Sequence, residues 1–150
     1  MRRIVLTGGP GGGKTALLHA LAARGYAIVA ESARAIIQAR KARSLSPRPN
    51  PLEFAQEVLT QDIEQYERQE TPSATVFFDR GILDALCMLN RAAPLAPTEF
   101  KAFLTFEGAL RVYEELVQWY RRGEYEVVEV PRLSVAERCA YVLHAMDAAA

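Results

Sequence analysis

The stretch Gly8-Gly9-Pro10-Gly11-Gly12-Gly13-Lys14-Thr15 matches the phosphate-loop pattern G-x-x-x-x-G-K-[ST] at every defined position. Glycines let the backbone curl until consecutive N–H groups point at one anion. A helix that begins near Lys14 adds the positive end of its dipole. Lys14 is then expected to reach the β- and γ-phosphates of a nucleotide, and the Thr15 hydroxyl to bind Mg²⁺. We therefore predict a phosphate-binding loop here.

The residues on both sides of the loop favour a strand–loop–helix arrangement. An apolar run at residues 4–6 precedes the loop and predicts a buried strand. Leucines at helical spacing follow over residues 14–24, and Gly25 fits the left-handed end of such a helix. The nucleotide-binding residues predicted for this unit are Gly8, Gly11, Gly12, Gly13, Lys14, Thr15 and Ala16.

Two other interpretations of the glycine-rich stretch compete with a phosphate loop. It could be a flexible loop that carries Lys14 and Thr15 by chance. Residues 11–16 also fit the dinucleotide pattern G-x-G-x-x-A, with Glu31 at a plausible distance. That frame begins past the turn at which the fingerprint should open, and it leaves Lys14 and Thr15 without a role. The phosphate loop is favoured because it accounts for both residues.

Strand and helix patterns alternate along the rest of the chain. Further strands are predicted over residues 26–30, 75–78 and 125–130, and helices over residues 32–41, 51–69, 82–91, 99–122 and from residue 134 onward, while residues 102–106 fit either type. The alternation predicts an α/β fold, a three-layer sandwich around a mainly parallel sheet of four to five strands. The length of 150 residues suits a single domain over residues 1–150.

Composition excludes several classes of function. Lys and Arg total 18 and Asp and Glu total 18, so the chain lacks the net positive field that attracts nucleic acid or an anionic membrane. No apolar run approaches the roughly 20 residues of a membrane helix. Cys87 and Cys139 lack C-x-x-C spacing and are expected to be reduced and buried. These features predict a cytoplasmic protein.

The strand predicted at residues 75–78 is followed by a carboxylate, Asp79. Ligands bind at the carboxyl ends of parallel strands, so Asp79 is expected beside the phosphate loop. There it can hold Mg²⁺ through water, or accept the proton of a substrate hydroxyl. A structural alternative is that Asp79 or Asp84 caps the helix over residues 82–91. We favour a functional role for Asp79 over a capping role. The predicted catalytic residues are Lys14 and Asp79, and the predicted Mg²⁺ ligands are Thr15 and Asp79.

Three further charged residues are candidates for substrate binding. Glu31 follows the second predicted strand, and its carboxylate can accept hydrogen bonds from a sugar or another hydroxyl substrate. It could equally favour the dipole of the helix that begins at Ser32. Arg80 could contact phosphate or lie on the surface. Arg34 belongs to a basic stretch over residues 32–52 that more often forms a solvated helix face, and it is the best candidate there for an anionic substrate.

The order of three motifs also resembles a known family. Thr7 to Thr15, then Glu31-Ser32-Ala33-Arg34, then the stretch from Phe77 to Asp84 resemble the predicted ATPases of the AAA domain group related to NadR. That group contains a nicotinamide riboside kinase domain and many small bacterial proteins. The resemblance covers about residues 1–92 and 106–146.

The resemblance implies a kinase-like P-loop NTPase fold that binds ATP with Mg²⁺. On this chain Glu31, Arg34 and Arg80 would then line the side of the acceptor, a small molecule such as a nucleoside or riboside, and Arg132 would lie near the adenine. Such proteins normally carry a strand and an arginine-bearing lid where this chain has residues 97–107 with a single lysine. The expected activity is an ATP-dependent small-molecule kinase or ATPase. The alternative is a nucleotide-binding regulator or degenerate kinase with little turnover, because lid arginines stabilise the transferred phosphoryl.

Overall fold

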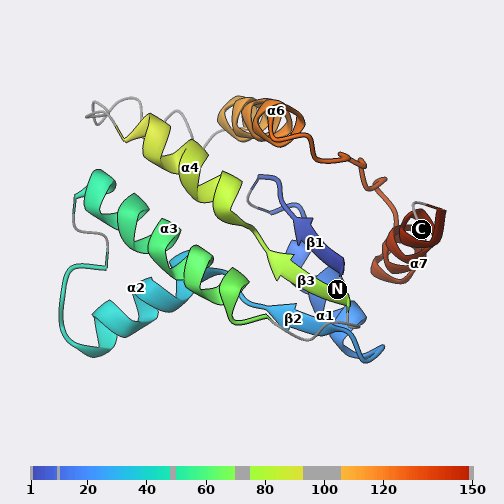
Figure 1. Ribbon diagram of the computed structural model, residues 1–150, viewed down its shortest axis with the longest axis horizontal. Coiled ribbons are helices and arrows are strands. Elements are labelled where there is room, and N and C mark those ends of the chain that lie inside the picture. Colours follow the sequence, from blue (N-terminus) through green and yellow to red (C-terminus); the bar gives the residue numbers. More distant parts are fainter. Residues whose placement is uncertain (1, 10, 48–49, 70–74, 93–105, 149–150) are drawn as a thin grey trace.

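The computed structural model describes residues 2–9, 11–47, 50–69, 75–92 and 106–148, with the backbone alone described over residues 106–112 (Figure 1). Strands and helices alternate through the first part of the chain, and two helices follow. The elements are β1 (Arg2–Leu6), α1 (Lys14–Ala22), β2 (Ala27–Val29), α2 (Ser32–Ala42), α3 (Pro51–Glu67), β3 (Thr75–Asp79), α4 (Ile82–Arg91), α6 (Phe106–Arg122) and α7 (Val135–Ala148). The predicted α/β fold is confirmed.

The described strands form one parallel sheet in the order β1–β3–β2. The central strand, β3, has a buried apolar run at residues 76–78. Such a run suits a central parallel strand, because both of its faces are covered by other elements. Leu6 of β1 pairs with Asp79, and Val29 of β2 pairs with Phe78. The carboxyl ends of all three strands therefore lie at the same edge of the sheet.

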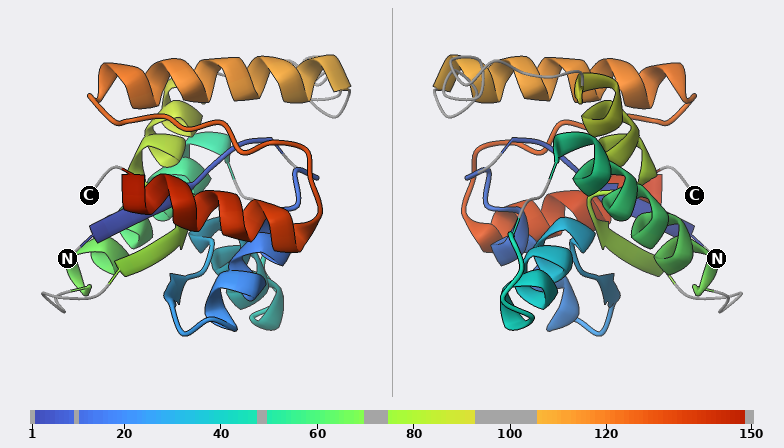
Figure 2. Two further views of the ribbon diagram at one scale, coloured as in Figure 1. Left: turned by 90° about the vertical axis from the view of Figure 1, so that its right-hand side faces the viewer. Right: turned by 90° about the vertical axis from the view of Figure 1, so that its left-hand side faces the viewer.

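Helices cover both faces of this sheet. Phe77 belongs to a buried cluster with Leu17 of α1 and Val142 of α7. The next residue, Phe78, points to the opposite face, where its ring lies 5.9 Å from that of Tyr66 on α3. Figure 2 shows α7 on one side of the sheet and α3 on the other. None of the helices in the described ranges is long and apolar enough to cross a membrane.

The prediction of a strand over residues 125–130 is wrong. In the structure this segment is irregular and connects α6 to α7, and it pairs with no strand in the described ranges. Tyr125 and Val128 are 48% and 45% exposed, whereas Val130 packs against the cluster between α1 and α7. An apolar sequence forms a strand only where a neighbour accepts its backbone hydrogen bonds. The described sheet therefore has three strands, not the four to five expected. Residues 97–105, most of the stretch in which the usual lid is expected to be lacking, lie outside the described ranges, so that expectation stays a prediction.

The two cysteines are buried and form no disulfide, as predicted. Burial, and then the Glu115 carboxylate that accepts a hydrogen bond from its thiol, raise the pKa of Cys87 to about 12. Cys139 lies in the cluster between α1 and α7. Cys87 is therefore an unreactive thiol.

Candidate functional site

The glycine-rich stretch forms the connection between β1 and α1, as the phosphate-loop motif requires. Gly11 and Gly13 have φ angles of +79° and +72°, a left-handed conformation that favours glycine. Gly13 is the residue directly before the first turn of α1. Gly25, which has a φ of +88°, follows the other end of this helix, as predicted. The local geometry therefore agrees with a loop that leads into a helix N-terminus.

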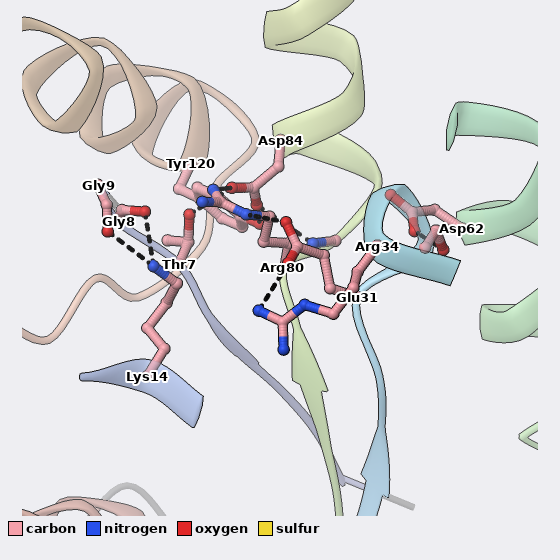
Figure 3. Close-up of polar contacts among 12 residues, drawn as sticks. Thr7, Gly8, Gly9, Lys14, Glu31, Arg34, Asp62, Arg80, Asp84 and Tyr120 are labelled. Atoms are coloured by element: carbon pink, nitrogen blue, oxygen red, sulfur yellow. Dashed lines mark hydrogen bonds and ion pairs between the residues drawn. The ribbon is translucent and has the colours of Figure 1, made fainter. Parts of the chain in front are cut away.

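Lys14 is the first residue of α1, and its side chain folds back over the loop (Figure 3). Its Nζ donates hydrogen bonds to the carbonyl oxygens of Gly8 at 2.9 Å and Gly9 at 2.8 Å. Burial, and then the positive charge of Arg80, lower the pKa of Lys14, while Asp79 opposes them. The ammonium group is thus held at the loop by two neutral oxygens.

The other residues predicted to contact the nucleotide differ in their exposure. Thr15 is partly buried and Ala16 is exposed, both in the first turn of α1. Gly12 is exposed in the loop, and Arg132 is exposed in the segment between α6 and α7. Their contacts with a nucleotide remain predictions.

Asp79 lies at the carboxyl end of β3, beside Leu6 at the end of β1. Its side chain is buried, and it makes no hydrogen bond or ion pair with any residue in the described ranges. Burial, followed by the negative charge of Glu31, raises the pKa of Asp79, and the positive charge of Lys14 opposes that rise. The strand end therefore presents a carboxylate with unoccupied oxygens close to the Lys14 ammonium.

Arg80 is held between two carboxylates. Its Nε donates to Glu31 Oε1 at 3.0 Å, and its Nη1 donates to Asp84 Oδ1 at 3.1 Å. Burial disfavours the charged form, but Asp84 and Glu31 outweigh it and raise the pKa of Arg80. Glu31 also forms an ion pair of 3.5 Å with the more exposed Arg34. The three residues predicted for substrate binding are thus brought together, and two acids neutralise Arg80.

Asp84 is the residue that joins the site to the rest of the fold. It is buried, and its two oxygens accept hydrogen bonds from four donors. The donors are Thr7 Oγ1 at 2.5 Å, Arg80 Nη1 at 3.1 Å, Gly81 N at 3.2 Å and the Tyr120 hydroxyl at 2.5 Å. The bond from Gly81 confirms the structural alternative for Asp84, which caps α4.

Sequence reasoning missed Thr7 and Tyr120 as parts of this site. Thr7 directly precedes the phosphate-loop pattern, which begins at Gly8, and nothing in the local sequence pairs Tyr120 on α6 with Asp84 on α4. Burial, and then Asp84, raise the pKa of Tyr120, so its hydroxyl stays protonated as a donor. Asp84 thus links the start of the loop, Arg80 and α6.

A further acid, Asp62 on α3, lies on the Glu31 side of the site (Figure 3). Its Oδ1 accepts a hydrogen bond of 2.5 Å from the buried hydroxyl of Ser32, which also accepts one of 3.1 Å from Gln65. Asp62, Gln65 and Arg80 line a cavity of about 30 Å³. A cavity of that volume has room for a water molecule.

We expect Asp62 to make the protein more stable at pH 5 than at pH 7. Burial raises its pKa from 3.8 to about 6, although the Ser32 bond opposes the rise. The folded state therefore binds the proton more tightly, and this contribution is lost as the pH rises through 6. Between pH 5 and pH 7 the loss for this partly exposed group is about 1 kcal/mol.

The Asp62→Asn variant should accordingly melt at a higher temperature than wild type at pH 7 and lose part of the pH dependence. Thermal melting at pH 5 and pH 7 measures both effects. Glu67→Gln, which changes an exposed acid on the same helix, serves as the control. Equal pH dependence in wild type and Asp62→Asn would show that Asp62 has an ordinary pKa.

The side chains at the loop fit Mg²⁺ better than a transition metal. A hydroxyl from Thr15 and a carboxylate from Asp79 are hard oxygen donors. The described residues contain no cluster of three or more His, Cys, Asp or Glu that could hold a metal alone. Mg²⁺ keeps several waters and is commonly bound together with substrate phosphates, so two oxygen donors from the protein fit it.

One comparison with known proteins identifies a family that covers most of the site. The family described as AAA domain matches residues 3–102, two thirds of the chain. No curated protein and no solved structure matches. The matched range contains the glycine-rich loop, Lys14, Glu31 and the Asp79–Asp84 segment. The chain therefore belongs to the AAA domain family of nucleotide-binding P-loop proteins.

Proposed function

We propose that this protein is an ATP- and Mg²⁺-dependent phosphotransferase acting on a small hydroxyl-bearing molecule. One observation carries the proposal: the Lys14 ammonium and the Asp79 carboxylate, which makes no hydrogen bond with a described residue, lie together at the carboxyl edge of the sheet. A phosphate loop accounts for Lys14 alone. A nearby buried carboxylate with unoccupied oxygens is what a reacting hydroxyl needs.

The chemistry assigned to these groups is a single displacement. Bound ATP supplies the phosphoryl group that is transferred. Lys14 exchanges the Gly8 and Gly9 carbonyls for phosphate oxygens, and the loop N–H groups hold the same anion. The hydroxyl oxygen of the acceptor forms a bond to the γ-phosphorus, and the bond from that phosphorus to its bridging oxygen breaks. ADP leaves with the bridging oxygen, and Asp79 accepts the proton of the acceptor hydroxyl. A raised pKa makes Asp79 a stronger base for this step.

The charges around Arg80 favour a neutral polar acceptor. Glu31 and Asp84 already neutralise its guanidinium, so an anionic acceptor would have to break a paired network. Glu31 offers carboxylate oxygens to hydroxyl groups, and Arg34 lies more exposed at its other side. These features suit the hydroxyls of a nucleoside or riboside.

Three measurements test the proposal. ATP with Mg²⁺ should raise the melting temperature more than GTP with Mg²⁺, because the chain lacks the guanine-binding motif N-K-x-D. Phosphate release without an acceptor would indicate an ATPase, and transfer to one member of a riboside panel would indicate a kinase. ATP binding without either reaction would favour the alternative, a regulatory or degenerate protein. A melting temperature that responds to no nucleotide would contradict the proposal.

A further inference from the structure

One arginine outside the matched family region lies against the phosphate loop. Arg138, on α7, is separated from Gly12 by 126 residues, yet its Nη1 donates to the Gly12 carbonyl at 3.1 Å. A Cβ atom added to Gly13 would lie 2.7 Å from the same nitrogen. Gly12 and Gly13 directly precede Lys14. The guanidinium is therefore next to the two glycines from which the chain enters α1.

The bonding of Arg138 is incomplete. It forms no ion pair with any carboxylate in the described ranges, and its Nε is buried without a hydrogen-bond partner. Among the described residues, its one side-chain hydrogen bond is to the neutral carbonyl of Gly12. Arg80, whose charge also acts on Lys14, differs from Arg138 because Arg80 forms ion pairs with two carboxylates, Glu31 and Asp84. A partly buried guanidinium without a counter-charge is unfavourable unless an anion completes it.

We propose that Arg138 is a nucleotide-binding residue whose guanidinium contacts the phosphate groups of the bound nucleotide. This inference rests on the proposed function, since it takes the anion to be the nucleotide at the loop. Binding would replace the Gly12 carbonyl with charged oxygens and supply a partner for the unpaired nitrogen. Arginine suits this role, because its planar fork binds phosphate oxygens in pairs. The nucleotide phosphates would then be bound by two positive side chains, Lys14 of α1 and Arg138 of α7.

A structural role for Arg138 predicts different results from a charge-supplying role. If the guanidinium only stabilises the loop through its hydrogen bond to the Gly12 carbonyl, R138Q and R138K keep a hydrogen-bond donor. Both variants should then bind nucleotide like wild type. If it supplies charge, R138K should stay within a few-fold of wild type, while R138Q and R138M both weaken ATP–Mg²⁺ by about 10- to 100-fold.

The melting temperature without nucleotide gives a second readout, because the two roles predict different changes in the melting temperature of R138M. Removing a structural brace should lower the melting temperature of R138M. Removing an unpaired, partly buried charge should leave that temperature unchanged or raise it. R24Q is the matched control, because Arg24 is exposed at the far end of α1 and also donates to a carbonyl, that of Ala20 at 3.0 Å.

The test measures ATP–Mg²⁺ affinity by calorimetry for wild type, these four variants and Lys14→Ala. We expect R138Q and R138M to lose affinity while R24Q and R138K do not. Wild-type affinity in R138Q and R138M overturns the role of Arg138 but leaves the proposed function intact, provided that Lys14→Ala has lost binding. Absence of binding in wild type itself overturns the proposed function, and the inference on Arg138 with it.

Discussion

Replacing Lys14 with alanine is expected to weaken ATP–Mg²⁺ binding by roughly 100-fold or more. Hydrogen bonds to charged groups contribute about 1.5–3 kcal/mol each, and Lys14 is expected to reach two phosphates. At saturating nucleotide, a loss of this size removes about 2.7 kcal/mol of nucleotide-induced stabilisation. Calorimetric titration measures the affinity, and thermal melting with and without ATP–Mg²⁺ measures the lost stabilisation.

The same substitution should change the nucleotide-free protein little. Two hydrogen bonds to the Gly8 and Gly9 carbonyls are lost, but an ammonium group whose pKa is lowered by burial is removed with them. Lys41→Ala provides the control, since Lys41 is exposed in the last turn of α2. If Lys14→Ala keeps wild-type affinity while the protein stays folded, the nucleotide does not bind at this loop.

The parts of the site that could be predicted from sequence are those set by neighbouring residues. The phosphate loop joins β1 to α1 within a few residues, so the glycines, Lys14 and the two flanking elements form one local pattern. Asp79 was predictable for a related reason, because the end of a parallel strand beside β1 must lie near the loop. These local rules were enough to predict that a basic and an acidic side chain, Lys14 and Asp79, lie at the carboxyl edge of the sheet.

The remaining features depend on contacts between distant segments. Tyr120 meets Asp84 from another helix, and Arg138 reaches Gly12 across most of the chain. No spacing rule in the sequence relates either pair. The wrong strand at residues 125–130 has the same cause, since its apolar pattern says nothing about whether a neighbouring strand is present to pair with it.

The pairing of Arg80 changes how its predicted role is understood. From the sequence, Arg80 was a candidate for direct contact with substrate or phosphate. The structure engages it with Glu31 and Asp84 and gives it a φ of +71°, a conformation uncommon for residues other than glycine. Those ion pairs stabilise the turn between β3 and α4. Arg80 therefore orients Glu31 and joins it to the network around Asp84.

Replacing Asp79 with asparagine is expected to lower kcat by about 100- to 10,000-fold while ATP binding persists. Asparagine preserves the shape of the side chain but cannot accept the acceptor proton as a carboxylate does. Stability should not fall, because the carboxylate makes no hydrogen bond or ion pair with the described residues, and burial already raises its pKa. Steady-state kinetics with the acceptor, together with ATP titration, separate turnover from binding. Asp147→Asn, at an exposed position on α7, is the control.

A Mg²⁺ titration of the Asp79→Asn variant distinguishes the two roles open to this carboxylate. If Asp79 holds Mg²⁺ through water, the variant needs a higher Mg²⁺ concentration, and added Mg²⁺ restores much of the turnover. If Asp79 accepts the proton, turnover stays low at every Mg²⁺ concentration, because a metal cannot replace the lost base. We expect the second result, since the carboxylate is buried at the strand end with its pKa raised, as a proton acceptor requires. Turnover equal to wild type at low Mg²⁺ would contradict both roles, and the reacting hydroxyl would then have to lie away from β3.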